Sequence, residues 1–126
     1  MYKIIWVGLG GFLGASGRYL AGGLLHRLVN HAWLPIGTLG VNILGCLLIG
    51  MLGRWAQESR WWGDSGHLFV VVGILGGFTT FSSFGFETVD LLRNKQPAGA
   101  VLYVTASVLL GLLAVFGGYF LAGHHR

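Results

Sequence analysis

Four long apolar blocks, separated by short polar stretches, dominate the pattern of hydrophobic and polar positions along the chain. They cover residues 4–25, 36–53, 68–92 and 98–122. A helix needs roughly 20 mostly apolar residues to cross about 30 Å of hydrocarbon, and each block is close to that length. Because the bilayer core offers no water to backbone groups, each block is expected to be essentially helical. The pattern predicts an all-α integral membrane protein with four transmembrane helices.

The polar stretches are too short for a soluble domain, so the whole chain, 1–126, is expected to form a single transmembrane domain. Pro35 and Pro97 stand at the starts of the second and fourth blocks, where a missing N–H is tolerated. The first block superficially resembles a signal peptide, but three further apolar blocks follow it. We therefore expect a retained first helix and a multi-pass membrane protein.

Composition changes the picture only by excluding other classes. Charged residues make up 10% of the chain, against roughly 25% in soluble domains. The net charge is +4, and the scattered Lys and Arg favour contacts with lipid headgroups over nucleic acid. The single cysteine, Cys46, allows no disulfide within the chain, and the histidines show no ligand-like spacing within a helix. No nucleophile–base pair is visible, so we do not expect an enzyme.

The positive charges do not favour one orientation in the membrane. With four spans, the two sides of the bilayer receive equal numbers of Lys and Arg: Lys3, Arg54, Arg60 and Arg126 on one side, and Arg18, Arg27, Arg93 and Lys95 on the other, with Arg18 counted as snorkelling. One interpretation is that the rule is noisy for so few charges. The other is that the protein inserts both ways and pairs antiparallel, since dual insertion requires such a tie.

The middle of the third block is unusually polar and rich in glycine. Gly76 and Gly77 each cost about 1 kcal/mol in a helix interior. The hydroxyls of Thr79, Thr80, Ser82 and Ser83 then compete for backbone hydrogen bonds. The segment predicts a break of the third helix near mid-membrane, where freed carbonyls suit a small dehydrated cation. The alternative is that the hydroxyls bond the carbonyls and the helix only kinks.

Three phenylalanines at spacing three, Phe78, Phe81 and Phe84, are expected to form one face of the third helix. Such a face usually serves packing. A phenylalanine ring also has a positive edge, which an anion can meet without meeting a full opposite charge. Weak contacts of this kind suit an ion that must be bound and then released.

Neutral hydrogen-bond donors accompany the rings. Thr38 and Asn42 share one face of the second helix, and Tyr103 and Ser107 share one face of the fourth. A buried Asn is more often a link between helices than a ligand site. Together with Thr80, these donors form a lining without fixed charge, which favours a small, strongly hydrated anion.

Two charged residues and two pairs of glycines leave alternatives open. Arg18 and Glu87 lie within spans, near their ends, where a vestibule or an ion pair is expected; Arg18 draws anions there or snorkels to headgroups. Small-residue pairs, Gly10 with Gly14 and Gly73 with Gly77, allow backbones to approach closely. The approach is either within one chain or between two copies.

Three motifs carry a resemblance to a known family. The stretch GGFTTFSSF at 76–84 resembles the third-helix signature of the Fluc-type (CrcB) fluoride ion channels. The stretch GTLGVN at 37–42 and the stretch GGFLGA at 10–15, followed by Arg18, resemble their second-helix and first-helix motifs. The resemblance covers the whole chain, and the third-helix motif is the most specific of the three.

The resemblance implies an antiparallel, dual-topology homodimer in the bacterial inner membrane, with two fluoride pores and no protein partner besides the second copy. Such a channel exports cytoplasmic fluoride passively and relieves its toxicity. The resemblance, with the shared helix faces, assigns a fluoride pathway to Thr38, Asn42, Thr80, Phe81, Phe84, Tyr103 and Ser107. It assigns the vestibule to Arg18 and a structural sodium ion to the backbone carbonyls of Gly76 and Thr79.

The chain departs from the family pattern at two positions. Phe78 stands where Leu or Met is expected, and Gly111, one turn after Ser107, has no hydroxyl to continue the polar track. The departures put the far end of that track in doubt.

Two rival functions remain open from the sequence. A small multidrug-type proton-coupled antiporter needs an embedded carboxylate, usually in the first helix, whereas the only acids within these spans are Glu87 and Asp90. A non-transporting membrane scaffold accounts for tight packing and for Asn as a link between helices. It gives no reason for a break in the third block.

Overall fold

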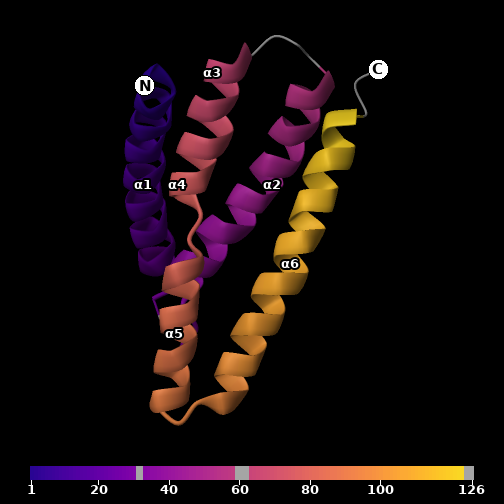
Figure 1. Cartoon of the computed structure of the whole chain (residues 1–126). Helices are drawn as coiled ribbons and strands as arrows, with labels where there is room; N and C mark the ends of the chain where they lie inside the picture. Colours follow the sequence, from indigo (N-terminus) through magenta and orange to yellow (C-terminus); the bar gives the residue numbers. More distant parts are fainter. Residues whose placement is uncertain (31–32, 59–62, 124–126) are drawn as a thin grey trace.

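The computed structural model describes residues 1–30, 33–58 and 63–123, and within them the regular structure is entirely helical, as the apolar pattern predicts. The described residues form long helices and a segmented one, whose arrangement can be followed in Figure 1. The long helices are α1 (Tyr2–Leu28), α2 (Ile36–Glu58) and α6 (Pro97–Gly123). The segmented helix consists of α3 (Gly63–His67), η1 (Leu68–Leu75), α4 (Gly76–Phe78) and α5 (Phe81–Arg93). Arg60 and Arg126, which enter the charge count, lie outside the described residues.

Three stretches of the described chain are long and apolar enough to cross a membrane. They are Ile36–Ala56, Gly63–Arg93 and Pro97–Gly123. The first helix, α1, has 27 residues, but Arg18 and several glycines lower its apolar content.

Glycines bring α1 into backbone contact with the segmented helix. Gly10 and Gly14 are buried, and a Cβ atom there would collide with the carbonyl oxygens of Phe69 and Ile74 respectively. A Cβ atom at Gly73 would lie 2.8 Å from the Cα atom of Gly10. The two small-residue faces seen in the sequence therefore meet each other within one chain, along α1 and η1.

A second close approach joins α2 to α6, which lie side by side in Figure 1. A Cβ atom at Gly50 would collide with the Val115 carbonyl oxygen, and one at Gly118 with the Leu47 carbonyl oxygen. Each helix therefore presents a glycine to the other helix's backbone. This reciprocal fit fixes the position of α6, and with it the side chains that α6 carries, relative to α2.

The buried core is small and lies where α5 and α6 meet α2. Leu91, Ala100 and Tyr103 form it, and Tyr103 has no exposed surface at all. Large apolar side chains elsewhere, for example Phe12, Phe86 and many on α6, are exposed. In water such a surface would be unstable, so lipid or a second copy must cover it.

The segmented helix is interrupted after α4. Thr79 and Thr80 have extended backbone, with φ and ψ of −84° and 155° and of −146° and 120°. Helix α5 then begins at Phe81, and the Thr80 hydroxyl caps it by accepting the N–H of Ser83 at 3.2 Å. Figure 1 shows this non-helical connection between α4 and α5.

Candidate functional site

Asn42 holds the interrupted segment, the extended residues Thr79 and Thr80 between α4 and α5, in place. Its Nδ2 atom donates to the Thr80 carbonyl oxygen at 3.0 Å, and its Oδ1 atom accepts the Thr80 N–H at 2.8 Å. The side-chain amide therefore satisfies both backbone groups of a residue that has left the helix. This is the linking role that a buried Asn usually has, and it occupies one of the two N–H donors of the amide.

The same rearrangement removes the helical donors of two carbonyls. In a continuous α-helix the Thr80 N–H would bond the Gly76 carbonyl, and the Ser83 N–H would bond the Thr79 carbonyl. Here the first N–H is directed to Asn42 and the second to the Thr80 hydroxyl. Carbonyls at an unwound segment are suitable ligands for a hard cation. The two carbonyls are those to which the resemblance assigns sodium.

Glu87 is the hub of a second hydrogen-bond group. The Thr38 hydroxyl donates to its Oε1 atom at 2.6 Å, and the Tyr103 hydroxyl donates to its Oε2 atom at 2.6 Å. Helices α2 and α6 thus each supply one donor to a carboxylate on α5. Short hydrogen bonds to a carboxylate are among the stronger ones in proteins. The sequence predicts a vestibule or an ion pair for Glu87, and the structure shows two hydroxyl partners for its carboxylate beside the first cavity.

A first cavity, of about 520 Å³, lies between α1, α2 and α5. Its polar and charged lining consists of Arg18, Tyr19, His26, Thr38, Thr80, Ser83 and Glu87. Arg18 is partly buried and belongs to this lining, so the structure places it at a cavity rather than on a fully exposed surface. His26 and Ser83 were not among the predicted site residues, because neither has a periodic partner in the sequence.

A second cavity, of about 360 Å³, lies on the other side of the interrupted segment. It is lined by Asn42, Cys46, Gly76, Thr79, Phe81, Phe84 and Ser107, together with apolar side chains. Thr80 lines both cavities. The interrupted segment is therefore the point at which the charged first cavity and the uncharged second cavity come together.

The second cavity contains an unused donor and an aromatic pair. The Ser107 hydroxyl oxygen is buried and has no hydrogen-bond partner among the described residues. The rings of Phe81 and Phe84 are 5.5 Å apart between centroids, and Phe84 lies 5.3 Å from Tyr103. The Ser107 hydroxyl is therefore available to donate to a ligand in the cavity.

The prediction that three phenylalanines share one face is wrong. Phe78 belongs to α4, and two extended residues separate it from Phe81 and Phe84 on α5. Its ring lies close to Gly17 of α1 and Gly45 of α2. A helical phase does not continue across an extended segment, so spacing three does not keep Phe78 beside the other two rings.

The predicted site residues therefore divide into three groups. Asn42, Phe81, Phe84 and Ser107 line the second cavity, and Thr80 lines both. Arg18 and Thr38 line the first cavity. Tyr103 lines neither cavity and is buried behind Glu87.

Comparison with known proteins identifies the family. A sequence profile described as "CrcB-like protein, Camphor Resistance (CrcB)" matches residues 5–119. The chain belongs to the CrcB-like family. Family membership, together with three helices of membrane-spanning length and composition, makes it a multi-pass membrane protein.

Several proteins similar to this chain bear the name "Fluoride-specific ion channel FluC". The one from Helicobacter pylori (strain G27) is 43% identical over 122 residues, which is 96% of this chain and 93% of that protein. The one from Helicobacter acinonychis (strain Sheeba) is 43% identical over 119 residues, 94% of this chain and 93% of that protein. The one from Caulobacter sp. (strain K31) is 41% identical over 128 residues, which is 97% of this chain and 95% of that protein. These relatives are ion channels, not enzymes.

Proposed function

We propose that this protein is a fluoride-selective channel that exports cytoplasmic fluoride passively and so relieves fluoride toxicity. The observation that carries the proposal is the described lining of the second cavity, where an amide, two phenylalanine rings and a hydroxyl without a partner among the described residues meet without a charged side chain. Such a lining can replace the water around a small anion and still release it. The names of the relatives give the anion its identity.

The pathway we propose runs through both cavities. Arg18 attracts anions into the first cavity, and Thr80 lies where the ion passes to the second. There Asn42 and Ser107 donate hydrogen bonds, and Phe81 and Phe84 offer ring edges. Thr38 and Tyr103 act on the pathway through Glu87, because both hydroxyls stabilise its carboxylate.

We further propose that the working unit is an antiparallel, dual-topology homodimer with two pores, in which α1 is a fourth span and the interruption lies near mid-membrane. The equal charge count on the two sides supports dual insertion. Phe81 supports a second copy, because it lines the second cavity although 84% of its surface is exposed. An ion beside that ring needs another wall to exclude lipid, and a second chain would supply it. The bacterial relatives favour the inner membrane as its location.

A structural sodium ion fits the interrupted segment. The carbonyls of Gly76 and Thr79 would hold it, from both copies, since the N–H groups that would occupy them in a helix are bonded elsewhere. The ion would bind the two copies together and takes no part in conduction. Replacement of sodium by N-methylglucamine is expected to weaken the dimer, measured as the monomer fraction by light scattering. An unchanged monomer fraction would contradict the sodium site.

Fluoride efflux from liposomes that contain only this protein tests the main proposal. Vesicles loaded with potassium fluoride receive valinomycin to balance charge, and an electrode records the released fluoride with equal pH on both sides. We expect rapid efflux of fluoride and none of chloride. Efflux that requires a proton gradient would favour the antiporter, equal passage of chloride would remove selectivity, and no efflux would favour the scaffold.

A further inference from the structure

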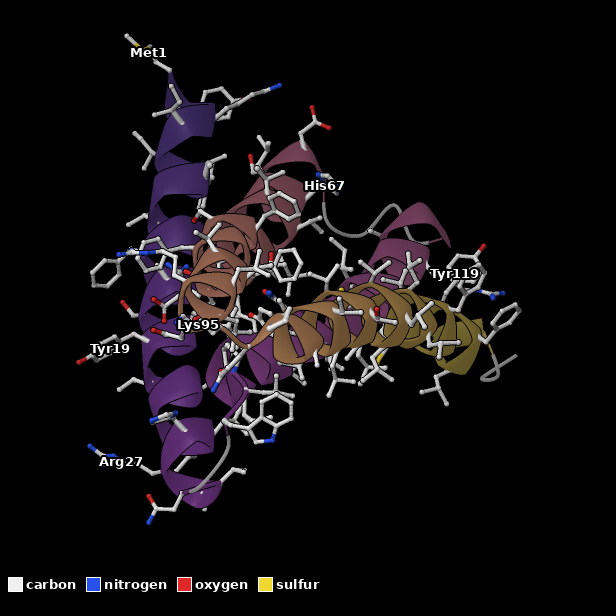
Figure 2. All side chains as sticks on the ribbon, turned by 90° about the horizontal axis from the view of Figure 1, so that it is seen from below. Met1, Tyr19, Arg27, His67, Lys95 and Tyr119 are labelled. Atoms are coloured by element: carbon white, nitrogen blue, oxygen red, sulfur yellow. The ribbon has the colours of Figure 1, made fainter. Side chains whose placement is uncertain are left out.

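Two side chains of α1 that carry or can acquire positive charge line the first cavity. Arg18 and His26 are eight residues apart, which corresponds to about 12 Å along a helix, and Gly22 lies between them on the same wall. Arg18 is partly buried, whereas His26 is exposed. Along the sequence His26 lies beyond Arg18, next to Arg27 at the C-terminal end of α1, an end that Figure 2 marks with Arg27.

Among the residues that the structure describes, few other ionisable groups line this cavity. Helix α2 contributes Gly37, Thr38 and Val41, and Pro35 precedes it; none of these side chains titrates. Helix α5 contributes Glu87, whose carboxylate is bonded to two hydroxyls. Helix α1 contributes Arg18, the exposed Tyr19 and His26.

The charge of the His26 imidazole therefore sets the net charge of the described lining of the cavity. Within the described lining, the formal charges of Arg18 and an ionised Glu87 cancel, so these residues carry no net charge when His26 is neutral. A protonated His26 makes it positive. Histidine is the side chain whose charge ordinarily changes between pH 5 and pH 8.

We propose that His26 makes the supply of anions to the pathway depend on pH, with faster conduction when its imidazole is protonated. The inference rests on the proposed channel function and deepens it, by naming a residue that regulates entry. One unit charge about 10 Å from a monovalent anion in water changes the local anion concentration roughly twofold. Salt screens this attraction over about 10 Å at 0.1 M and about 3 Å at 1 M, so the effect belongs to low ionic strength.

Currents through the purified protein in a planar bilayer test the inference, because neutral hydrogen fluoride carries no current. At low ionic strength and low fluoride, we expect the current to rise about twofold from pH 8 to pH 5.5. The rise should disappear at 1 M of an impermeant salt. His26→Gln should give equal currents at both pH values, and His26→Lys should keep the higher current at both.

Two further histidine variants serve as controls. His67 ends α3, away from the Arg27 end of α1 (Figure 2), and it does not line the cavity. His67→Gln should therefore keep the full pH dependence. His31 lies outside the described residues and is five residues from His26 in the sequence. His31→Gln should also keep the pH dependence, which distinguishes an effect of His26 from one of His31.

The possible outcomes distinguish this inference from the function on which it rests. A fluoride current that is the same at pH 8 and pH 5.5 overturns the role of His26 but does not contradict the proposed channel function. A pH dependence that survives in His26→Gln and vanishes in Glu87→Gln assigns the effect to the carboxylate and likewise overturns it. The absence of any fluoride current overturns the proposed function and this inference together.

Discussion

The side-chain amide of Asn42 and the peptide group of Thr80 bond each other twice, at 2.8 and 3.0 Å. The pair lies where the two cavities come together, since Asn42 lines the second cavity and Thr80 lines both. A single side chain therefore supports the backbone of the interrupted segment and borders the proposed pathway. Loss of the amide should affect stability and conduction at once.

Asn42→Asp keeps an acceptor for the Thr80 N–H and replaces the donor by a negative charge. The carboxylate faces the Thr80 carbonyl and the path of the anion, so we expect fluoride efflux from liposomes to fall at least about tenfold. Asn94→Asp makes the same chemical change at an exposed position outside both cavities, and its efflux should stay near that of the parent. Equal efflux from the two variants would remove Asn42 from the pathway.

Tyr103→Phe removes one of the two hydroxyls that bond the Glu87 carboxylate. Because the site is buried, we expect the free energy of unfolding in detergent to fall by about 1.5–3 kcal/mol, measured by thermal or denaturant unfolding. Tyr119→Phe is the matched control, since it keeps the ring that faces Arg54 at 4.7 Å and changes a more exposed residue. A loss no greater than that of the control would show that the hydrogen bond to Glu87 contributes little.

Ser107→Ala removes a buried hydroxyl that has no partner among the described residues. Since no hydrogen bond is lost, we expect unchanged stability. Fluoride conduction should fall roughly fivefold, because one neutral hydrogen bond to the ion, about 1 kcal/mol, is lost. Thr105→Ala, on the exposed side of the same helix, should conduct like the parent. The role of Ser107 fails if both variants conduct equally.

Gly14→Ala places a methyl group against the Ile74 carbonyl and the Phe78 amide nitrogen, both of which are backbone atoms. Helix α1 must shift away from the segmented helix, and we expect a loss of about 1–3 kcal/mol in unfolding free energy. Gly8→Ala meets no atom within 4 Å on the same helix, so it should be neutral or stabilise by up to about 1 kcal/mol. Similar losses for the two variants would contradict the close approach of the two backbones.

The sequence by itself determined the helical class and the approximate positions of the long helices. Blocks 4–25, 36–53 and 98–122 each lie within one helix, because long apolar runs and terminal prolines act locally and need no distant partner. All the predicted site residues except Tyr103 line at least one of the two cavities, whereas Tyr19, His26, Ser83 and Glu87 of the lining were not among them. Residue type and spacing suffice for this where a helix is continuous.

Only the tertiary structure decided which partner each polar group has. Thr38 and Asn42 share a helix face, yet one bonds Glu87 and the other bonds the Thr80 backbone. Phe78 and Phe81 do not share a helix face, because the extended residues between them interrupt the helical periodicity. A hydrogen bond from an N–H donor needs a donor–acceptor distance of about 2.7–3.2 Å, and the distance between two helices depends on all the residues packed between them, here including glycines. Periodicity along one helix carries no information about that distance.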